Sequence, residues 1–168
     1  KIEFDMPVET HLLLVEDRPE DAFLVEKILR RALGEDESLV VTKAESLAAA
    51  IERLGQRHFA CVLLDLGLPD ARGLSTLRRL RSVNEKIPVV VLSGIDDEQT
   101  ALSAVEYGAH AYVAKRGIED SENIWAVVQE AIRSRAPTPL RTATALTRRG
   151  HFRLDGKNRI IRWDEQCE

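Results

Sequence analysis

The sequence lacks any long apolar run. A membrane-spanning helix needs roughly 18 to 20 apolar residues, and no hydrophobic stretch here approaches that length. The first ten residues also lack the apolar core of a secretion signal. The longest apolar runs are short enough to be buried strands: Leu12–Val15, Cys61–Leu64 and Val89–Leu92. We therefore expect a protein that is neither exported nor held in a membrane.

Cysteine is scarce. The chain has two, Cys61 and Cys167, and they lie far apart in sequence. This excludes a disulfide framework and a cysteine metal site. We expect Cys61 to be a buried free thiol, and a reducing cytoplasm as the location. Glycine-rich phosphate loops are absent as well, and the four histidines share no ligand spacing.

Charge is unevenly distributed along the chain. The net charge is −4, yet residues 136–168 carry seven basic and four acidic residues, so residues 1–135 carry −7. An acidic body does not favour direct nucleic-acid binding. The basic tail is expected to be mainly a solvated linker.

Short apolar strands alternate with amphipathic helices over about 125 residues. The expected strands are Leu12–Val15, Leu39–Thr42, Cys61–Leu64, Val89–Leu92 and Ala111–Ala114. The expected helices run from Pro19 to Gly34, over Leu47–Leu54 with Gly55 closing it, over Leu74–Leu80, over Glu98–Tyr107 up to Gly108, and over Asn123–Arg133. Five βα units predict an α/β fold, a doubly wound five-stranded parallel sheet in the flavodoxin-like order 2-1-3-4-5.

The C-terminal part of the chain has a different character. Pro137 and Pro139 open a segment without clear periodicity, so residues 136–150 are expected to be a linker. Two short strands, His151–Leu154 and Arg159–Trp163, are expected around a turn. Two strands do not make an independent domain, so residues 151–168 are expected to be an incomplete second domain after a first domain at 11–135.

Polar residues follow four of the expected strands. Glu16 and Asp17 follow the first strand, Asp65 the third, Ser93 the fourth and Lys115 the fifth. Ligands of open α/β sheets bind beyond these strand ends. Three carboxylates close together repel one another unless a cation lies among them, and Mg²⁺ prefers such oxygen ligands. A lone aspartate can act as a nucleophile toward a phosphoryl group, with the lysine and the hydroxyl stabilising that group.

Four segments around these residues resemble the signatures of response-regulator receiver domains: Leu14–Asp17, Leu64–Gly73, Val91–Gly94 and Tyr112–Lys115. The resemblance covers about residues 11–135. It implies a phosphorelay module of two-component signalling that is not an enzyme in its own right. Its expected partners are a sensor histidine kinase and a C-terminal sensory or output domain, and a homodimer is possible.

The resemblance also implies roles for individual residues at the metal site. Asp65 would be the phosphoacceptor, with a histidine kinase or a small phosphodonor as the source. Glu16, Asp17 and Asp65 would hold Mg²⁺, together with the backbone carbonyl of Gly67. Lys115 would pair with the phosphoryl group.

Two further residues match the family's switch. Ser93 would follow the phosphate, and Tyr112 would turn inward with it, although a packing tyrosine is an equal alternative. The family usually has a proline after the lysine, and Arg116 stands there instead. This departure puts in doubt the family's dimer geometry through the last two helices, but it removes no chemical group.

Two other functions stay open. A receiver-like interaction module that is never phosphorylated is the first, and Arg116 is the feature that favours it. A Mg²⁺-dependent phosphohydrolase is the second, but such enzymes resembling the haloacid-dehalogenase type need a second aspartate where Gly67 stands. Residues 150–164 resemble the first hairpin of a PAS sensory domain, with Asp164 where that family often has asparagine, and a generic hairpin is the alternative.

Overall fold

The computed structural model describes residues 8–94, 98–116, 124–134, 143–147, 150–154 and 160–164. The helices are α1 (Pro19–Ala32), α2 (Leu47–Gln56), α3 (Leu74–Val83), α4 (Glu98–Glu106) and α5 (Ile124–Arg133). The strands are β1 (Val8–Val15), β2 (Glu37–Ala44), β3 (Cys61–Asp65), β4 (Val89–Ser93), β5 (Ala111–Ala114), β6 (Ala143–Thr147), β7 (Gly150–Leu154) and β8 (Ile160–Asp164).

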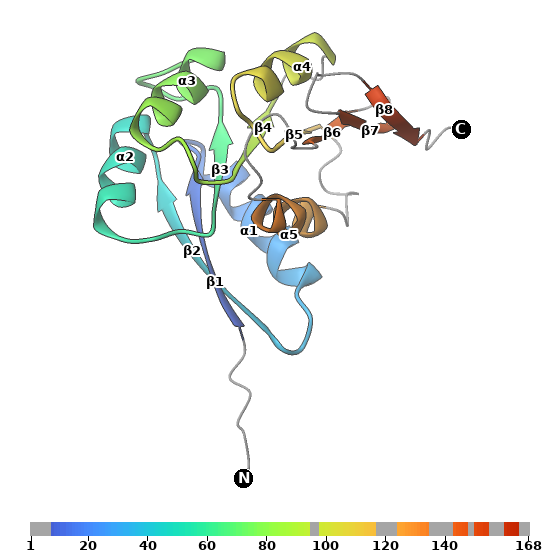
Figure 1. Ribbon diagram of the computed structural model, residues 1–168. Coiled ribbons are helices and arrows are strands. Elements are labelled where there is room, and N and C mark those ends of the chain that lie inside the picture. The colour runs from blue at the N-terminus through green and yellow to red at the C-terminus, as the bar shows by residue number, and fades with distance from the viewer. Residues whose placement is uncertain are drawn as a thin grey trace.

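One sheet runs through the whole molecule, in the order β2-β1-β3-β4-β5-β6-β7-β8. Its first five strands are parallel and have the expected order 2-1-3-4-5, so the flavodoxin-like prediction is confirmed. Helices α1 and α5 lie on one face of this sheet, and α2, α3 and α4 lie on the other (Figure 1).

Alternating side chains of the central strands divide the core into two layers. Leu12 and Leu14 pack with α1 and α5, whereas Leu13 and Val15 pack with the helices of the opposite face. The two layers completely bury the apolar segments Leu12–Val15, Cys61–Leu64 and Val89–Leu92, which is why these segments are apolar at every position. Cys61 is a buried free thiol as expected, and burial raises its pKa to about 12.

Several element boundaries differ from those expected. Helix α2 continues through Gly55 to Gln56, so the prediction that this glycine closes the helix is wrong. Helix α1 ends at Ala32 with Leu33 as its C-cap, and Gly34 follows directly, in agreement with the prediction that this glycine ends the helix. Gly108 does follow α4 as predicted and has a φ of 101°, a conformation that favours glycine.

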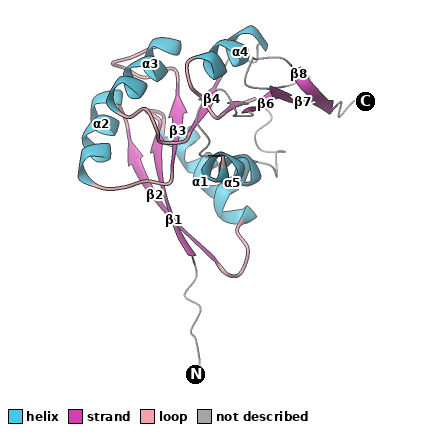
Figure 2. Cartoon of the chain, in the orientation of Figure 1, coloured by secondary structure: helices cyan, strands magenta, loops and turns pink. Residues whose placement is uncertain are grey.

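The C-terminal strands extend the receiver-like sheet (Figure 2). Residues 143–147, where no periodicity was evident, form β6, which pairs in parallel with β5. The two expected strands are present as β7 and β8, in antiparallel pairing. The turn at 155–158 and the first expected residue of the last helix, Asn123, lie outside the described residues.

The described helices are short. The longest is α1 with 14 residues, and none has both the length and the apolar character for crossing a bilayer.

Candidate functional site

The carboxyl ends of four parallel strands meet at one edge of the sheet. Asp65 lies opposite Leu92 in the β3–β4 ladder, and Ser93 lies opposite Ala114 in the β4–β5 ladder. The backbone N–H of Lys115 donates to the carbonyl of Ser93 at 2.7 Å. The sheet therefore brings the polar residues that follow separate strands into one cluster, as the sequence pattern predicts.

Three carboxylates form the centre of the cluster. One oxygen each of Glu16, Asp17 and Asp65 lies within 4.8 Å of the others. The Glu16 side chain is fully buried, and that of Asp65 is 7% exposed. Three negative groups at this distance repel one another unless a cation lies among them.

The three carboxylates differ in how they are satisfied. Glu16 accepts a hydrogen bond from the backbone N–H of Arg18 through Oε1 and pairs with Lys115 through Oε2. In the described part of the chain, Oδ1 of Asp17 is buried and has no hydrogen-bond partner. Buried acceptors are almost always paired in proteins, so this oxygen is placed where a cation would satisfy it.

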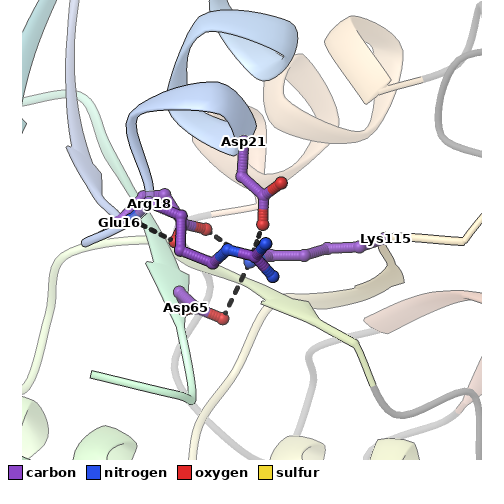
Figure 3. Close-up of polar contacts among 5 residues, drawn as sticks. All are labelled: Glu16, Arg18, Asp21, Asp65 and Lys115. Carbon is purple, nitrogen blue, oxygen red and sulfur yellow. Dashed lines mark hydrogen bonds and ion pairs between the residues drawn. The ribbon is translucent and has the colours of Figure 1, made fainter. Parts of the chain in front are cut away.

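Lys115 supplies the positive charge of the site. Its Nζ contacts Glu16, lies 3.0 Å from Oδ2 of Asp21 and lies 3.2 Å from Oδ1 of Asp65 (Figure 3). The three partners come from the end of β1, the first turn of α1 and the end of β3. The lysine thus joins the β1–α1 region to the end of β3, and all three partners are distant from Lys115 in sequence.

Burial and charge act in opposite directions on these groups. Burial raises the pKa of Glu16, and its hydrogen bond with Lys115 works against that rise. Burial works to lower the pKa of Lys115, but Glu16, Asp65 and Asp21 outweigh it, so the pKa of the lysine is raised. Lys115 therefore stays charged over the physiological range.

Gly67 lies directly beside the central aspartate. A Cβ built on Gly67 would lie 3.7 Å from Oδ2 of Asp65. The loop that follows β3 is closed by hydrogen bonds from the N–H of Leu68 to the carbonyl of Ala71 and from the N–H of Gly73 to the carbonyl of Leu66. The position next to Asp65 that would hold an acid/base carboxylate in a phosphatase is occupied by this glycine.

The two candidate switch residues are both buried. Ser93 is 2% exposed at the end of β4. Tyr112 is completely buried and belongs to the core layer that faces α2, α3 and α4. The tyrosine therefore already lies inside the fold in this structure, next to the strand end that carries Lys115.

Two acidic residues near the site were not expected from the sequence. Asp21 was expected only to interact favourably with the dipole of α1 from its first turn, yet it contacts Lys115. Its position in the first turn of α1, shortly after the acidic pair Glu16 and Asp17, is a signal that could have pointed to it. Asp70 lies in the loop after β3 and accepts hydrogen bonds from the N–H groups of Leu47 and Ala48, both at 2.9 Å, at the start of α2.

Known proteins share this architecture. The family model for the response regulator receiver domain matches residues 12–135. The KDP operon transcriptional regulatory protein KdpE of Escherichia coli K12 is 35% identical over 106 residues, which are 63% of this chain and 44% of KdpE. The transcriptional regulatory protein YkoG of Bacillus subtilis is 30% identical over 152 residues, which are 90% of this chain and 63% of YkoG.

A solved structure supports the fold independently. The two-component response regulator of the LuxR family from Aurantimonas sp. SI85-9A1 superposes with a TM-score of 0.66 at 19% identity, covering 84% of this chain and 91% of that one. The chain spans about half the length of KdpE and less than two thirds of YkoG. The family match covers most of the chain and includes every residue of the acidic cluster, so this protein belongs to the response regulator receiver family of phosphorelay signal transduction.

Proposed function

We propose that Asp65 is the phosphoacceptor of this chain. Its phosphorylation changes the packing of the C-terminal strands and thereby the state of a partner or a C-terminal output domain. The observation that supports this most is the contact of Asp65 with Lys115 beside two further carboxylates. A buried carboxylate next to a fixed ammonium group suits attack on a phosphoryl group, because the lysine can neutralise the phosphoryl oxygens.

The transfer needs no separate general base. A carboxylate oxygen of Asp65 attacks phosphorus and forms a new P–O bond. The bond from phosphorus to the donor breaks, a P–N bond for a phosphohistidine or a P–O bond for acetyl phosphate, and its electron pair leaves with the donor. Gly67 provides no base for rapid hydrolysis of the product, so the chain acts as a regulatory acceptor and not as a phosphohydrolase.

A divalent cation fits the acidic cluster. The donor set is three carboxylates, and the buried oxygen of Asp17 has no other partner among the described residues. Glu16, Asp17, Asp65 and the backbone carbonyl of Gly67 would hold Mg²⁺, which favours hard oxygen ligands. When bound, Mg²⁺ supplies positive charge that stabilises the transferred phosphoryl group.

The readout of phosphorylation would pass through β5. Ser93 and Tyr112 lie on neighbouring strands, and Lys115 follows β5 directly. Movement of the serine and tyrosine toward the phosphoryl group would shift β5, and β6 is paired with that strand at Tyr112 and Val113. The switch is then a change in population between two packings of the same strands.

The kinase and the output domain are also part of the proposal. A sensor histidine kinase is the expected phosphodonor, and the cytoplasm, which suits the free Cys61 thiol, is the expected location. Strands β7 and β8 suit the opening hairpin of a PAS-like sensory domain. The YkoG match favours a transcription-regulating output instead, because it extends over most of the chain. The sequence of the full-length gene decides between these outputs.

Intact-mass analysis tests the proposal directly. The protein is incubated with Mg²⁺ and acetyl phosphate or phosphoramidate, and a phosphate-sized gain in mass is expected. Asp65→Asn should show no gain, and EDTA should abolish the gain in the wild type. A wild type that gains nothing would support the unphosphorylated interaction module. An Asp65→Asn variant that gains as much would show that another residue accepts the phosphate and that the Asp65 proposal is wrong.

A further inference from the structure

Lys115 and a divalent cation would compete for the same carboxylate. Glu16 has both oxygens in use, one with the N–H of Arg18 and one with Lys115. The N–H of Arg18 is fixed by the backbone at the start of α1. A cation bound through Glu16 would repel the ammonium group of Lys115, the movable partner, so metal binding weakens that contact.

Asp21 offers the lysine another partner outside the metal cluster. Its Oδ2 lies 3.0 Å from Nζ of Lys115, yet it is not one of the three clustered carboxylates (Figure 3). It lies in the first turn of α1, where the helix dipole favours a negative charge. Its side chain is 30% exposed, so part of it remains in contact with solvent.

The balance of charge explains why such a partner is needed. Glu16, Asp17, Asp21 and Asp65 carry four negative charges, and Lys115 carries one positive charge. A dication in the cluster repels the lysine from Glu16 and weakens its attraction to Asp65. Without another carboxylate, the largely buried ammonium group would keep only its weakened attraction to Asp65 when the metal binds, which is costly.

We propose that Asp21 is a positioning residue that receives Lys115 when a divalent cation takes Glu16. The lysine then stays next to Asp65, ready to pair with the incoming phosphoryl group. This inference rests on the proposed function, because it assumes that the acidic cluster binds the metal. Loss of Asp21 destabilises the metal-bound form more than the metal-free form, in which Glu16 still holds the lysine.

Isothermal titration calorimetry with Mg²⁺ tests the inference on the full chain. Asp21→Asn is expected to weaken Mg²⁺ binding roughly three- to fivefold, the size of effect of a partly exposed ion pair. Glu20→Gln is the matched control, because Glu20 lies in the same turn, carries the same charge and is exposed. This control should change the affinity by less than about twofold.

A double-mutant cycle separates positioning from general electrostatics. In a Lys115→Met background, Asp21 has no ammonium group to pair with when the metal binds. Asp21→Asn should then change Mg²⁺ affinity by less than about twofold. An equal loss in both backgrounds, an equal loss in Glu20→Gln, or no loss in Asp21→Asn would overturn the inference. Circular dichroism in EDTA verifies that each variant is folded.

The outcomes distinguish this inference from the function on which it rests. If the wild type binds no Mg²⁺ in the calorimeter, the proposed metal site and the role of Asp21 are both wrong. If the wild type binds Mg²⁺ and gains phosphate while Asp21→Asn matches it in affinity, only the role of Asp21 is wrong.

Discussion

Among single residues, Asp17 carries the clearest cost for the metal-free protein. Its Oδ1 is buried without a hydrogen-bond partner in the described chain, beside two other carboxylates. A buried unpaired acceptor costs about 1–3 kcal/mol. If Asp17 holds the cation as proposed, this cost is offset by metal binding, and stability and binding are opposed at this one residue.

Asp17→Asn should therefore stabilise the metal-free protein and abolish its response to Mg²⁺. In EDTA we expect the free energy of unfolding to rise by about 1 kcal/mol, because one buried negative charge is removed. In Mg²⁺ at a hundredfold excess over Kd, the wild type should gain about 2.7 kcal/mol and the variant far less. Urea unfolding measures both values.

The control for this comparison is Asp36→Asn, an exposed aspartate in the turn between α1 and β2. It should leave stability nearly unchanged with and without Mg²⁺. An Asp17→Asn variant that is less stable in EDTA and still gains from Mg²⁺ would contradict the assignment of Asp17 as a metal ligand.

At the scale of elements, Asp70 joins the loop after β3 to helix α2. The N–H groups of Ala48 and Leu47 donate to its two oxygens and hold the pKa of Asp70 below its usual value. Ser46 caps the same helix through its own side chain, which accepts from the N–H of Ala49. The loop that carries Gly67 is thus anchored to the start of a helix, where unpaired N–H groups are available.

Asp70→Asn should lower the free energy of unfolding by about 1 kcal/mol at pH 7, as for loss of a helix cap. A carboxyl with a lowered pKa in the folded state contributes stability above its unfolded pKa. That contribution is lost as the pH falls through the folded-state value, below about 4. The difference between wild type and variant should accordingly shrink at low pH.

Urea unfolding at a series of pH values measures this difference. Asp36→Asn again provides an exposed aspartate for comparison. A difference that stays constant, or one that grows as the pH falls, would show that the Asp70 carboxylate does not cap α2 in solution.

The sequence predicts which helices and strands exist, because each buries an apolar face, better than it predicts the residues at which they end. All five βα units were predicted, because wholly apolar strands and helical periodicity depend only on which residues are buried. Gly55 was misleading: it is exposed inside α2, where a glycine costs only about 1 kcal/mol and the remaining helix tolerates it.

The features that were missed depend on partners distant in sequence. Strand β6 exists because it pairs with β5, and no local pattern in residues 143–147 reveals that partner. The contacts of Asp21 and Asp70 were missed for the same reason, since each residue contacts a partner more than twenty positions away. By contrast, the clustered residues of the site were predictable because parallel strands end at the same edge.

At the scale of the whole molecule, the site and the C-terminal strands share one sheet. Lys115 follows β5, and β5 lies between β4 and β6 in the strand order. Strand β2 lies at the opposite end of the sheet and, among the described strands, pairs only with β1. A change at the site therefore has a short route to β6 and a longer route to β2.

Phosphorylation should change hydrogen exchange in β6. We expect amides of residues 143–147 to exchange at an altered rate after treatment with acetyl phosphate and Mg²⁺, while those of β2 stay unchanged. Mass spectrometry of peptides from both strands measures the rates. Asp65→Asn treated in the same way provides the control, and an unaltered β6 in fully phosphorylated wild type would exclude this route.

The junction between β5 and β6 also bears on how such proteins diversify. Parallel strands are held together by backbone N–H and carbonyl groups, which every residue except proline can supply in full. A segment that adds to β5 in this way need not match a particular side-chain surface. One receiver could therefore be joined, over evolution, to unrelated downstream sequences while the backbone pairing next to its proposed phosphoacceptor is preserved.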